Sequence, residues 1–560
     1  MRSRARPLAD PFYYLRNFEA VLTAVSERYA DLLNDAERRF IADFAQVPQA
    51  SRALLVRMVM RKGDLFRAGK LSYAEIGAAD LAAGPLVAAG WVDDRPALCI
   101  DELRMLLTKP ELSQMFALTP AERKMPKAAL GTVLRLRWAQ AQPYDLWCGG
   151  TDRVYRLLAA TLCERFRLIF FGNFRQDWSE FVLADLGIFT YEKVASAPGA
   201  RAFHCRRHIE DFETLYRCRE RLHAGQPLHE VREGLPPPIA DCDWLAERRS
   251  RLEFQVARGF ERAGDAAAAA ELYEACRHPG ARIRAIRLKE RARHWAAARE
   301  LALRARQEVL DVAAQQQLAR LLPRLERKLG LAVPRSRPGT PVPRFDLCLE
   351  RPETPRAVEL LVRDHLAGVA DGAGVANGAS VRYVENGLIN SLFGLLCWDA
   401  IFAPIPGAFF HDFHRAPADF ASGHFYRRRQ HEFAACLALL EEGGYRQAMR
   451  RTFARKSGIE SPFVAWGLLS EELLECALEC FPPAHLRRWF EWIAHDVRHN
   501  RAGFPDLVQF WPAQGRYRLI EVKGPGDRLQ DNQRRLLEYC VEHDMPVAVC
   551  HVRWADAARA

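Results

Sequence analysis

Three polar side chains close to the C-terminal end have the types and spacing of a metal-dependent hydrolytic site. Asp506 follows Pro505, and Glu521 and Lys523 stand two residues apart in a stretch of alternating polar and apolar residues. Residues two apart in a strand point to the same face. Two carboxylates on an apolar-backed face repel each other and lose hydration unless a cation lies between them, and their oxygen atoms suit Mg²⁺ or Mn²⁺. Lys523 adds a compact positive charge that can orient or deprotonate an attacking water, or stabilise a pentacovalent transition state.

The segment around these residues has the pattern of a small α/β core. In chain order the pattern predicts strand 507–511, turn 512–515, strand 516–523, helix 527–543 and strand 547–552. A hairpin of the first two strands brings Asp506 beside Glu521. The rest of the chain has mostly helical periodicity. The fold class that we predict is a multidomain, mostly α protein with a C-terminal α/β core.

The same residues resemble a known family. Pro505-Asp506 followed by Glu521-Val522-Lys523 is the signature of PD-(D/E)xK nucleases. The longer strings GFPDLV (503–508), EVKGPGDRL (521–529) and VCHV (549–552) resemble the virus-type replication-repair nuclease (VRR-NUC) domain of the Fanconi-anaemia-associated nucleases, in a bacterial form. A second block, Glu385 with LFGLLCWD (392–399), is similar to the family segment that carries an upstream metal-binding glutamate.

The resemblance implies a structure-specific DNA nuclease that cuts near the 5′ end of flaps or branched DNA, acts as a 5′-to-3′ exonuclease and serves interstrand crosslink repair. It implies that one or two Mg²⁺ or Mn²⁺ ions are held by Glu385, Asp506, Glu521 and the main-chain carbonyl of Val522. Lys523 would be the catalytic lysine, and Gln533 the trailing helix glutamine of the motif. We expect branched or 5′-flap DNA as the partner, with no nucleotide cofactor and no membrane.

Breaks in composition and pattern divide the chain into four predicted parts, whose SAP-like and nuclease assignments are what the resemblance implies. They are an N-terminal helical region (1–65), a SAP-like or winged helical DNA-binding region (66–240), tetratricopeptide-like helical repeats (241–333) and the nuclease domain (345–560), which we expect to begin helical. A Pro- and Arg-rich linker over 334–343 precedes the last part. The repeats are suggested by two similar strings, 260–268 and 290–298, although a plain helical bundle fits as well.

Charge and composition favour an anionic partner in the cytoplasm. The chain of 560 residues has 81 Lys and Arg against 70 Asp and Glu, a net charge of +11. Arg498 and Arg501 lie just before Asp506 and are candidates for a 5′ phosphate or the strand backbone, with a solvated surface as the competing interpretation. The cysteines are scattered and the start has no secretory signal. We therefore expect a cytoplasmic protein, associated with the nucleoid in a bacterium.

Two alternatives stay open. The first is a DNA-binding repair scaffold with an inactive nuclease fold, against which the intact set of Asp506, Glu521 and Lys523 argues. The second is a zinc peptidase built on His495 and His499, whose spacing of four residues would place them on one helix face. Two further pairs, His204 with His208 and His411 with His414, resemble half of a zinc site and lack a matching second half.

Overall fold

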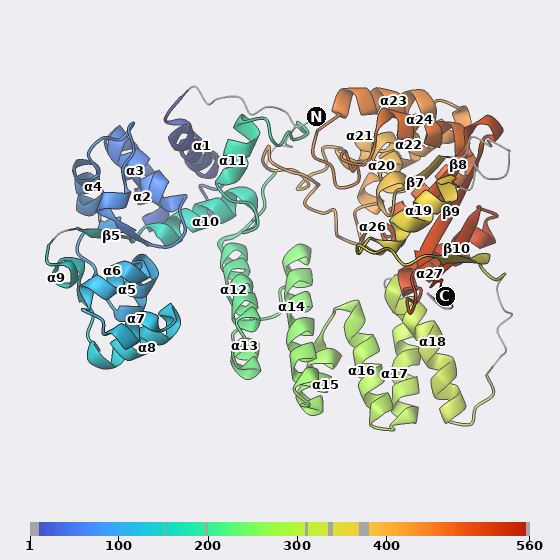
Figure 1. The fold of residues 1–560 in the computed structure, drawn as a ribbon, viewed down its shortest axis with the longest axis horizontal. Helices are drawn as coiled ribbons and strands as arrows, with labels where there is room; N and C mark the ends of the chain where they lie inside the picture. The colour runs from blue at the N-terminus through green and yellow to red at the C-terminus, as the bar shows by residue number, and fades with distance from the viewer. Residues whose placement is uncertain are drawn as a thin grey trace. The chain divides into compact units, whose positions relative to one another are not determined.

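The structure is a computed structural model that describes residues 10–150, 152–195, 200–308, 312–333, 340–368 and 380–555. The chain divides into two compact units (Figure 1). Unit 1 comprises Met1–Thr190 and Pro198–Ile209, and unit 2 comprises Tyr191–Ala197 and Glu210–Ala560. Most of the residues in regular elements are helical, as the sequence predicts. Among the described residues, no helix is both long and apolar enough to cross a membrane.

Unit 1 is helical around two very small sheets. Strand β1 (Leu65–Arg67) pairs antiparallel with β5 (Val154–Leu157), which also pairs with β2 (Val92–Asp93). The predicted boundary between residues 65 and 66 therefore falls inside a strand, because β1 finds its partner far along the chain. The remaining elements are α1 (Tyr13–Arg28), α2 (Asp35–Gln46), α3 (Gln49–Val59), α4 (Ala79–Ala88), β3 (Ala97–Leu98), α5 (Ile100–Leu106), α6 (Lys109–Met115), α7 (Pro120–Lys124), α8 (Lys127–Arg137), β4 (Gln142–Pro143), α9 (Tyr144–Cys148), α10 (Ala160–Phe171) and α11 (Ser179–Asp185).

Unit 2 begins with a row of antiparallel helices that stand side by side (Figure 1). Its members are α12 (Arg206–His223), which starts at the end of unit 1, α13 (Leu228–Glu233), α14 (Asp243–Arg262), α15 (Ala266–Ala275), α16 (Pro279–Arg291), α17 (Trp295–Gln307) and α18 (Val312–Lys328). Both similar strings of the sequence form a helix, a tight turn and a second helix, with a left-handed residue at Gly264 or Arg293. Most of α12 and all of α13 pack with unit 2, so the division between the two units lies ahead of the predicted boundary at residue 240. Residues 334–339 of the predicted linker lie outside the described residues.

The C-terminal part of unit 2 is built on one mixed sheet of five strands. Its order is β6-β10-β9-β8-β7, from β6 (Arg344–Leu349), β10 (Val547–Trp554), β9 (Arg516–Lys523), β8 (Leu507–Trp511) and β7 (Ser380–Tyr383). Strand β10 runs parallel to both β6 and β9, whereas β8 is antiparallel to β7 and β9. The prediction that this part begins helical is wrong, because β6 is its first element.

Helices cover both faces of this sheet. Helix α19 (Val358–Gly368) packs on one face through an apolar cluster with Leu507, Ile520 and Val522. The other face packs against a larger cluster that contains α27 (Asp531–Glu542) and α25 (Pro483–His495). The same cluster takes in α20 (Gly387–Leu396), α21 (Trp398–Ile401), α22 (Gln430–Glu442), α23 (Tyr445–Lys456), α24 (Glu471–Cys480) and part of the short α26 (Val497–Asn500). Alternate residues of β8 and β9 are therefore buried in two different cores.

Just before Asp506, the main chain at Gly503 packs closely against the main chain of α27. Gly503 has a positive φ of +99°, and a Cβ atom built there would lie 2.9 Å from the carbonyl carbon of Asn532 and 3.1 Å from the amide nitrogen of Gln533. A left-handed conformation favours glycine, and the neighbouring atoms are main chain that has little freedom to move. Gly503 therefore allows the segment that leads into Asp506 to pass over the first turn of α27.

We expect Gly503→Ala to lower the unfolding free energy of the C-terminal part of unit 2 by about 2–4 kcal/mol, from the positive φ and the main-chain overlap together. Urea unfolding followed by tryptophan fluorescence measures this change. The matched control is Gly467→Ala, where no atom lies within 4 Å of the added Cβ and no positive φ is present. Equal losses of stability in the two variants would contradict this account of the crossing.

Candidate active site

The sheet brings Glu385 and Asp506 together through their main chains. The carbonyl of Asp506, just before β8, accepts hydrogen bonds from the amides of Val384 (2.8 Å) and Glu385 (3.0 Å), just after β7. Glu385 itself has a positive φ of 32°, which is uncommon for a residue with a side chain. Strained residues of this kind are concentrated at functional sites. The main chains of Glu385 and Asp506 are therefore neighbours in the fold, and the role of Glu385 as a metal ligand stays a prediction.

The hairpin of β8 and β9 joins Asp506 to the Glu521–Lys523 stretch. The Oδ2 atom of Asp506 accepts a hydrogen bond of 2.8 Å from the amide of Val522, and the Nζ atom of Lys523 lies 2.7 Å from Oε1 of Glu521. The side chain of Glu521 is completely buried. Its ion pair with Lys523 lacks hydrogen-bond geometry, and neither of its carboxylate oxygens accepts a hydrogen bond from the described residues.

Because Glu521 and Asp506 are buried, the charged form of each carboxyl group is disfavoured when no cation is bound. The pKa of Glu521 rises from 4.5 to about 7, mainly through loss of hydration and also through the charge of Asp506, against the opposing effect of Lys523. Loss of hydration likewise raises the pKa of Asp506 from 3.8 to about 6. The amide of Val522 and the Lys523 ammonium lower that pKa, while Glu359 and Glu385 raise it. The site is an acidic cluster with too little positive charge of its own.

These residues fit a divalent cation by the chemistry of their donors. A fully buried carboxylate with two oxygens that accept no hydrogen bond is costly unless a cation compensates it. Carboxylate oxygens are the donors that Mg²⁺ and Mn²⁺ prefer. The oxygens of Glu385, Asp506 and Glu521 do not all lie within 4.8 Å of one another. A cation held by all three carboxylates would need them to move closer together, and a cation that contacts fewer of them would keep water ligands.

Three residues that the sequence reasoning missed surround the acidic cluster. Tyr383 donates a hydrogen bond of 2.6 Å from its hydroxyl to Oε2 of Glu385, which raises the tyrosine pKa. Asn386 accepts hydrogen bonds at Oδ1 from the amides of Gly503 (2.8 Å) and Phe504 (3.0 Å). Glu359, in the first turn of α19, adds negative charge that raises the pKa of Asp506. The nearness of Tyr383 and Asn386 to Glu385 in the chain is the one signal that points to two of them.

The predicted DNA-binding residues contact other groups of unit 2. Among the described residues, none of them forms a side-chain hydrogen bond or ion pair with the carboxylate cluster. Arg498 forms an ion pair of 3.0 Å with Glu247 of α14. The guanidinium of Arg501 lies over the ring of Phe420 and donates to the carbonyl of Pro462. Gln533 accepts from the amide of Gln530 in a capping box at the start of α27. Their contacts with DNA stay predictions.

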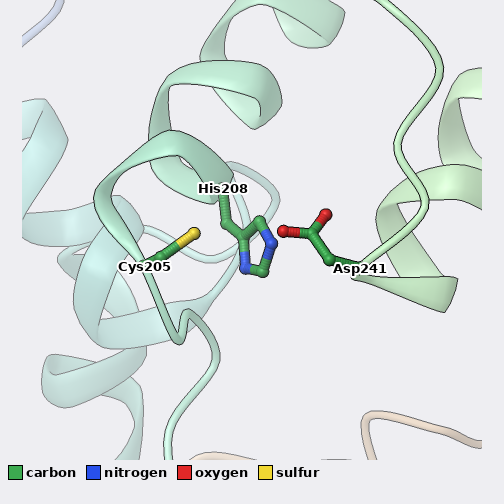
Figure 2. Close-up of side chains that lie close together, drawn as sticks. All are labelled: Cys205, His208 and Asp241. Carbon is green, nitrogen blue, oxygen red and sulfur yellow. The ribbon is translucent and has the colours of Figure 1, made fainter.

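Two of the three histidine pairs lack the geometry of a zinc site. Helix α25 ends at His495, and Asp496 leaves the helical conformation with a φ of −148°. His495 and His499 therefore do not share the face of one continuous helix, and Nδ1 of His499 bonds the Asp496 carboxylate instead. His411 and His414 stack on each other, and main-chain groups bond both rings. Figure 2 shows His208 in the first turn of α12 with Cys205 just before it, whereas the acidic residue drawn with them, Asp241, belongs to unit 2.

Comparison with known proteins gives three sequence profiles that match this chain. The VRR-NUC domain matches residues 440–554, which hold Asp506, Glu521 and Lys523 and leave out Glu385. The profile "FAN1, HTH domain" matches residues 12–93 and crosses the predicted boundary at residue 65. The profile "Fanconi anemia-associated nuclease SAP domain" matches residues 97–147.

Two named proteins match this chain, one over nearly its whole length and one over part of it. A Fanconi-associated nuclease 1 homologue of Pseudomonas aeruginosa is 53% identical over 98% of this chain and 97% of its own length. Human Fanconi-associated nuclease 1 is 33% identical over 30% of this chain, which spans 17% of the human protein. The structure matches the crystal structure of paFAN1 bound to a 2-nucleotide 5′-flap DNA with a gap. The TM-score is 0.93 and the identity 52%, over 99% of this chain and all of that one.

The raised pKa values lead to a test on the protein without DNA. A carboxyl whose pKa rises from 3.8 to about 6 on folding destabilises the fold at every pH above that range, and the penalty fades as the pH falls toward 4. In a chelator, Asp506→Asn should therefore be more stable than wild type at pH 8, by roughly 2–3 kcal/mol, and about equally stable at pH 4. Mn²⁺ should stabilise wild type at pH 8 more than the variant. Urea unfolding at the two pH values measures both effects.

The matched control is Asp364→Asn on α19. The neighbouring arginines Arg363 and Arg356 hold the pKa of Asp364 below its usual range, so this variant should gain no stability at pH 8. If Asp506→Asn is no more stable than wild type in the chelator, or if Mn²⁺ stabilises both proteins equally, the cluster is not the cation site described above.

Proposed function

This chain belongs to the Fanconi-associated nuclease family, and from that premise we propose that it is a metal-dependent nuclease that hydrolyses phosphodiester bonds near the 5′ end of flaps and branched DNA. The single observation that carries the proposal is the buried carboxylate of Glu521, held beside Asp506 and Lys523 at the end of β9 with no hydrogen bond to its oxygens. The 5′-flap DNA in the matched paFAN1 crystal structure supports the choice of substrate.

The chemistry follows from the donor set. We propose Glu385, Asp506, Glu521 and the main-chain carbonyl of Val522 as ligands for one or two Mg²⁺ or Mn²⁺ ions. When bound, such an ion lowers the pKa of a water and provides positive charge against the phosphate oxygens. Asp506 is oriented by the amide of Val522, and Glu385 by the hydroxyl of Tyr383. Lys523, anchored by Glu521, keeps its ammonium at the site and stabilises the charge that develops on the scissile phosphate.

DNA recognition, in this proposal, depends on shape and phosphate contacts. Arg498 and Arg501 precede Asp506 in the chain, and we propose that they bind a phosphate, for which Arg498 exchanges its ion pair with Glu247. Gly503 lies in the same segment as these arginines, and its main chain packs against the first turn of α27, which holds Gln533. We also propose 5′-to-3′ exonuclease action and a role in interstrand crosslink repair at the bacterial nucleoid. Both rest on the family resemblance.

The central test is cleavage of a labelled 5′-flap DNA in Mg²⁺ or Mn²⁺ by wild type and by Asp506→Ala. We expect the variant to bind the DNA with wild-type affinity and to cut it at least about a thousandfold more slowly, because it lacks a ligand of the ion that acts in the transition state. Gel electrophoresis measures cutting, and fluorescence anisotropy measures binding. The matched control is Asp531→Ala, an exposed carboxylate of α27 that pairs with Arg320 and should leave cutting unchanged.

The outcomes separate the proposal from the inactive scaffold. Equal cutting by wild type and Asp506→Ala would show that the carboxylate cluster is not the catalytic centre. Tight binding of the flap by wild type with no cutting in either metal would favour the scaffold.

A further inference from the structure

A second concave region lies beside the acidic cluster, at the carboxyl end of β9. It has a volume of about 600 Å³ and is lined by Arg344, Asp346, Gly524 to Asp527, and His551 to Trp554. We name this region the β6–β10 groove. Its lining contains none of the residues that the sequence reasoning assigned to catalysis or to DNA binding.

The strand register places the groove next to the catalytic lysine. His551 on β10 pairs with Lys523 on β9, and Asp346 on β6 pairs with His551. Paired residues in parallel strands point to one face, so these side chains share the face of Glu521 and Lys523. Neighbouring strands are about 4.8 Å apart, which puts β6 about 10 Å from β9. Phosphates of one DNA strand advance by about 3.4 Å along the axis, so a bound strand covers that distance within a few nucleotides.

The wall of the groove leaves main-chain atoms accessible. Residues Gly524 to Gly526 follow Lys523 directly, and the turn is closed by Asp527, whose Oδ2 accepts from the amide of Gly524 at 3.1 Å. Gly526 has a positive φ of +90° and no atom within 4 Å of the position where a Cβ would stand. A sugar–phosphate chain can therefore approach the turn closely, and the carboxylate of Asp527 is occupied within the turn.

The floor of the groove has two exposed arginines that can bind a phosphate. Arg344 on β6 and Arg553 on β10 are exposed, and His551 on β10 is half-buried next to Lys523 of β9. Arg553 pairs with Asp346 at 3.2 Å, and the two side chains are 73% and 57% exposed. An exposed ion pair of this kind contributes little stability, so Arg553 can exchange it for a phosphate at small cost. Guanidinium forks match phosphate oxygens in a bidentate geometry.

We propose that the β6–β10 groove binds the backbone of the cleaved DNA strand next to the scissile phosphate, with Arg344 and Arg553 on phosphate oxygens and the 524–526 turn against the sugar–phosphate chain. This inference rests on the proposed nuclease function. The groove is a positioning site: it holds the strand that enters or leaves the carboxylate cluster and takes no part in bond breaking.

The first test is the kinetics of flap cleavage by the double variant Arg344→Ala/Arg553→Ala. We expect KM to rise roughly fivefold or more with little change in kcat, and the slope of log affinity against log salt to fall by about 0.9 for each phosphate that the variant no longer binds. Asp346→Asn should have the opposite effect and lower KM, because it removes a negative charge and releases Arg553. The matched control is Arg516→Ala at the opposite end of β9, which should leave KM unchanged.

The second test locates the phosphate that the groove binds. Single methylphosphonate groups, which carry no charge, replace the phosphates on each side of the scissile bond in turn. At one or two of these positions the replacement should raise KM for wild type and have no further effect on the double variant. If every methylphosphonate raises KM as much in the double variant as in wild type, or if the double variant has the wild-type KM, the groove does not bind the strand. Either result would leave the nuclease proposal intact.

Binding of uncut flap DNA separates the two proposals. Fluorescence anisotropy with the Arg344→Ala/Arg553→Ala changes placed in Asp506→Ala measures the groove without cleavage. Weaker binding than Asp506→Ala alone supports the groove even if wild type fails to cut. Unchanged binding overturns it.

Discussion

Burial of Glu521 beside Asp506 is the constraint on which the nuclease part of the structure depends. Two carboxylates in one dry site cost hydration and repel each other, and the only cation that the described residues bring into contact with them is the Lys523 ammonium, paired with Glu521 at 2.7 Å. The pKa values of about 7 and about 6 record that cost. A site arranged in this way gains most from a divalent cation.

The surrounding fold holds the carboxylates in place despite that cost. Two apolar cores clamp β8 and β9 from opposite faces, so that the strand carrying Glu521 cannot turn its carboxylate to solvent without losing its packing. Hydrogen bonds from Val384 and Glu385 to the carbonyl of Asp506 tie β7 to β8 at the same point. Asn386 then fixes the amides of Gly503 and Phe504, and Gly503 permits the close crossing over α27. The site is thus set by main-chain contacts as much as by its own side chains.

The sequence was sufficient to predict strands and helices in which apolar residues recur at the spacing of a strand or a helix. Strands β8 and β9 have the predicted bounds, β10 extends the prediction by two residues, and α27 begins four residues later than predicted because the 524–530 segment forms a turn and a cap. Strands β6 and β7 were not predicted. Both lie at edges of the sheet, β6 is half-exposed, and their partners are more than a hundred residues away. A partner strand far along the chain likewise explains why a predicted boundary falls within β1. Tyr383, Asn386 and Glu359 were missed because their roles arise from contacts that spacing does not encode.

Manganese anomalous diffraction from crystals of the wild-type protein tests the central claim most directly. The account predicts an anomalous peak within about 2.0–2.2 Å of carboxylate oxygens of Asp506 and Glu521, and no such peak in Asp506→Ala. A peak that stays in place in the variant, or manganese bound only at sites remote from β8 and β9, would contradict the claim that burial of these carboxylates creates the cation site.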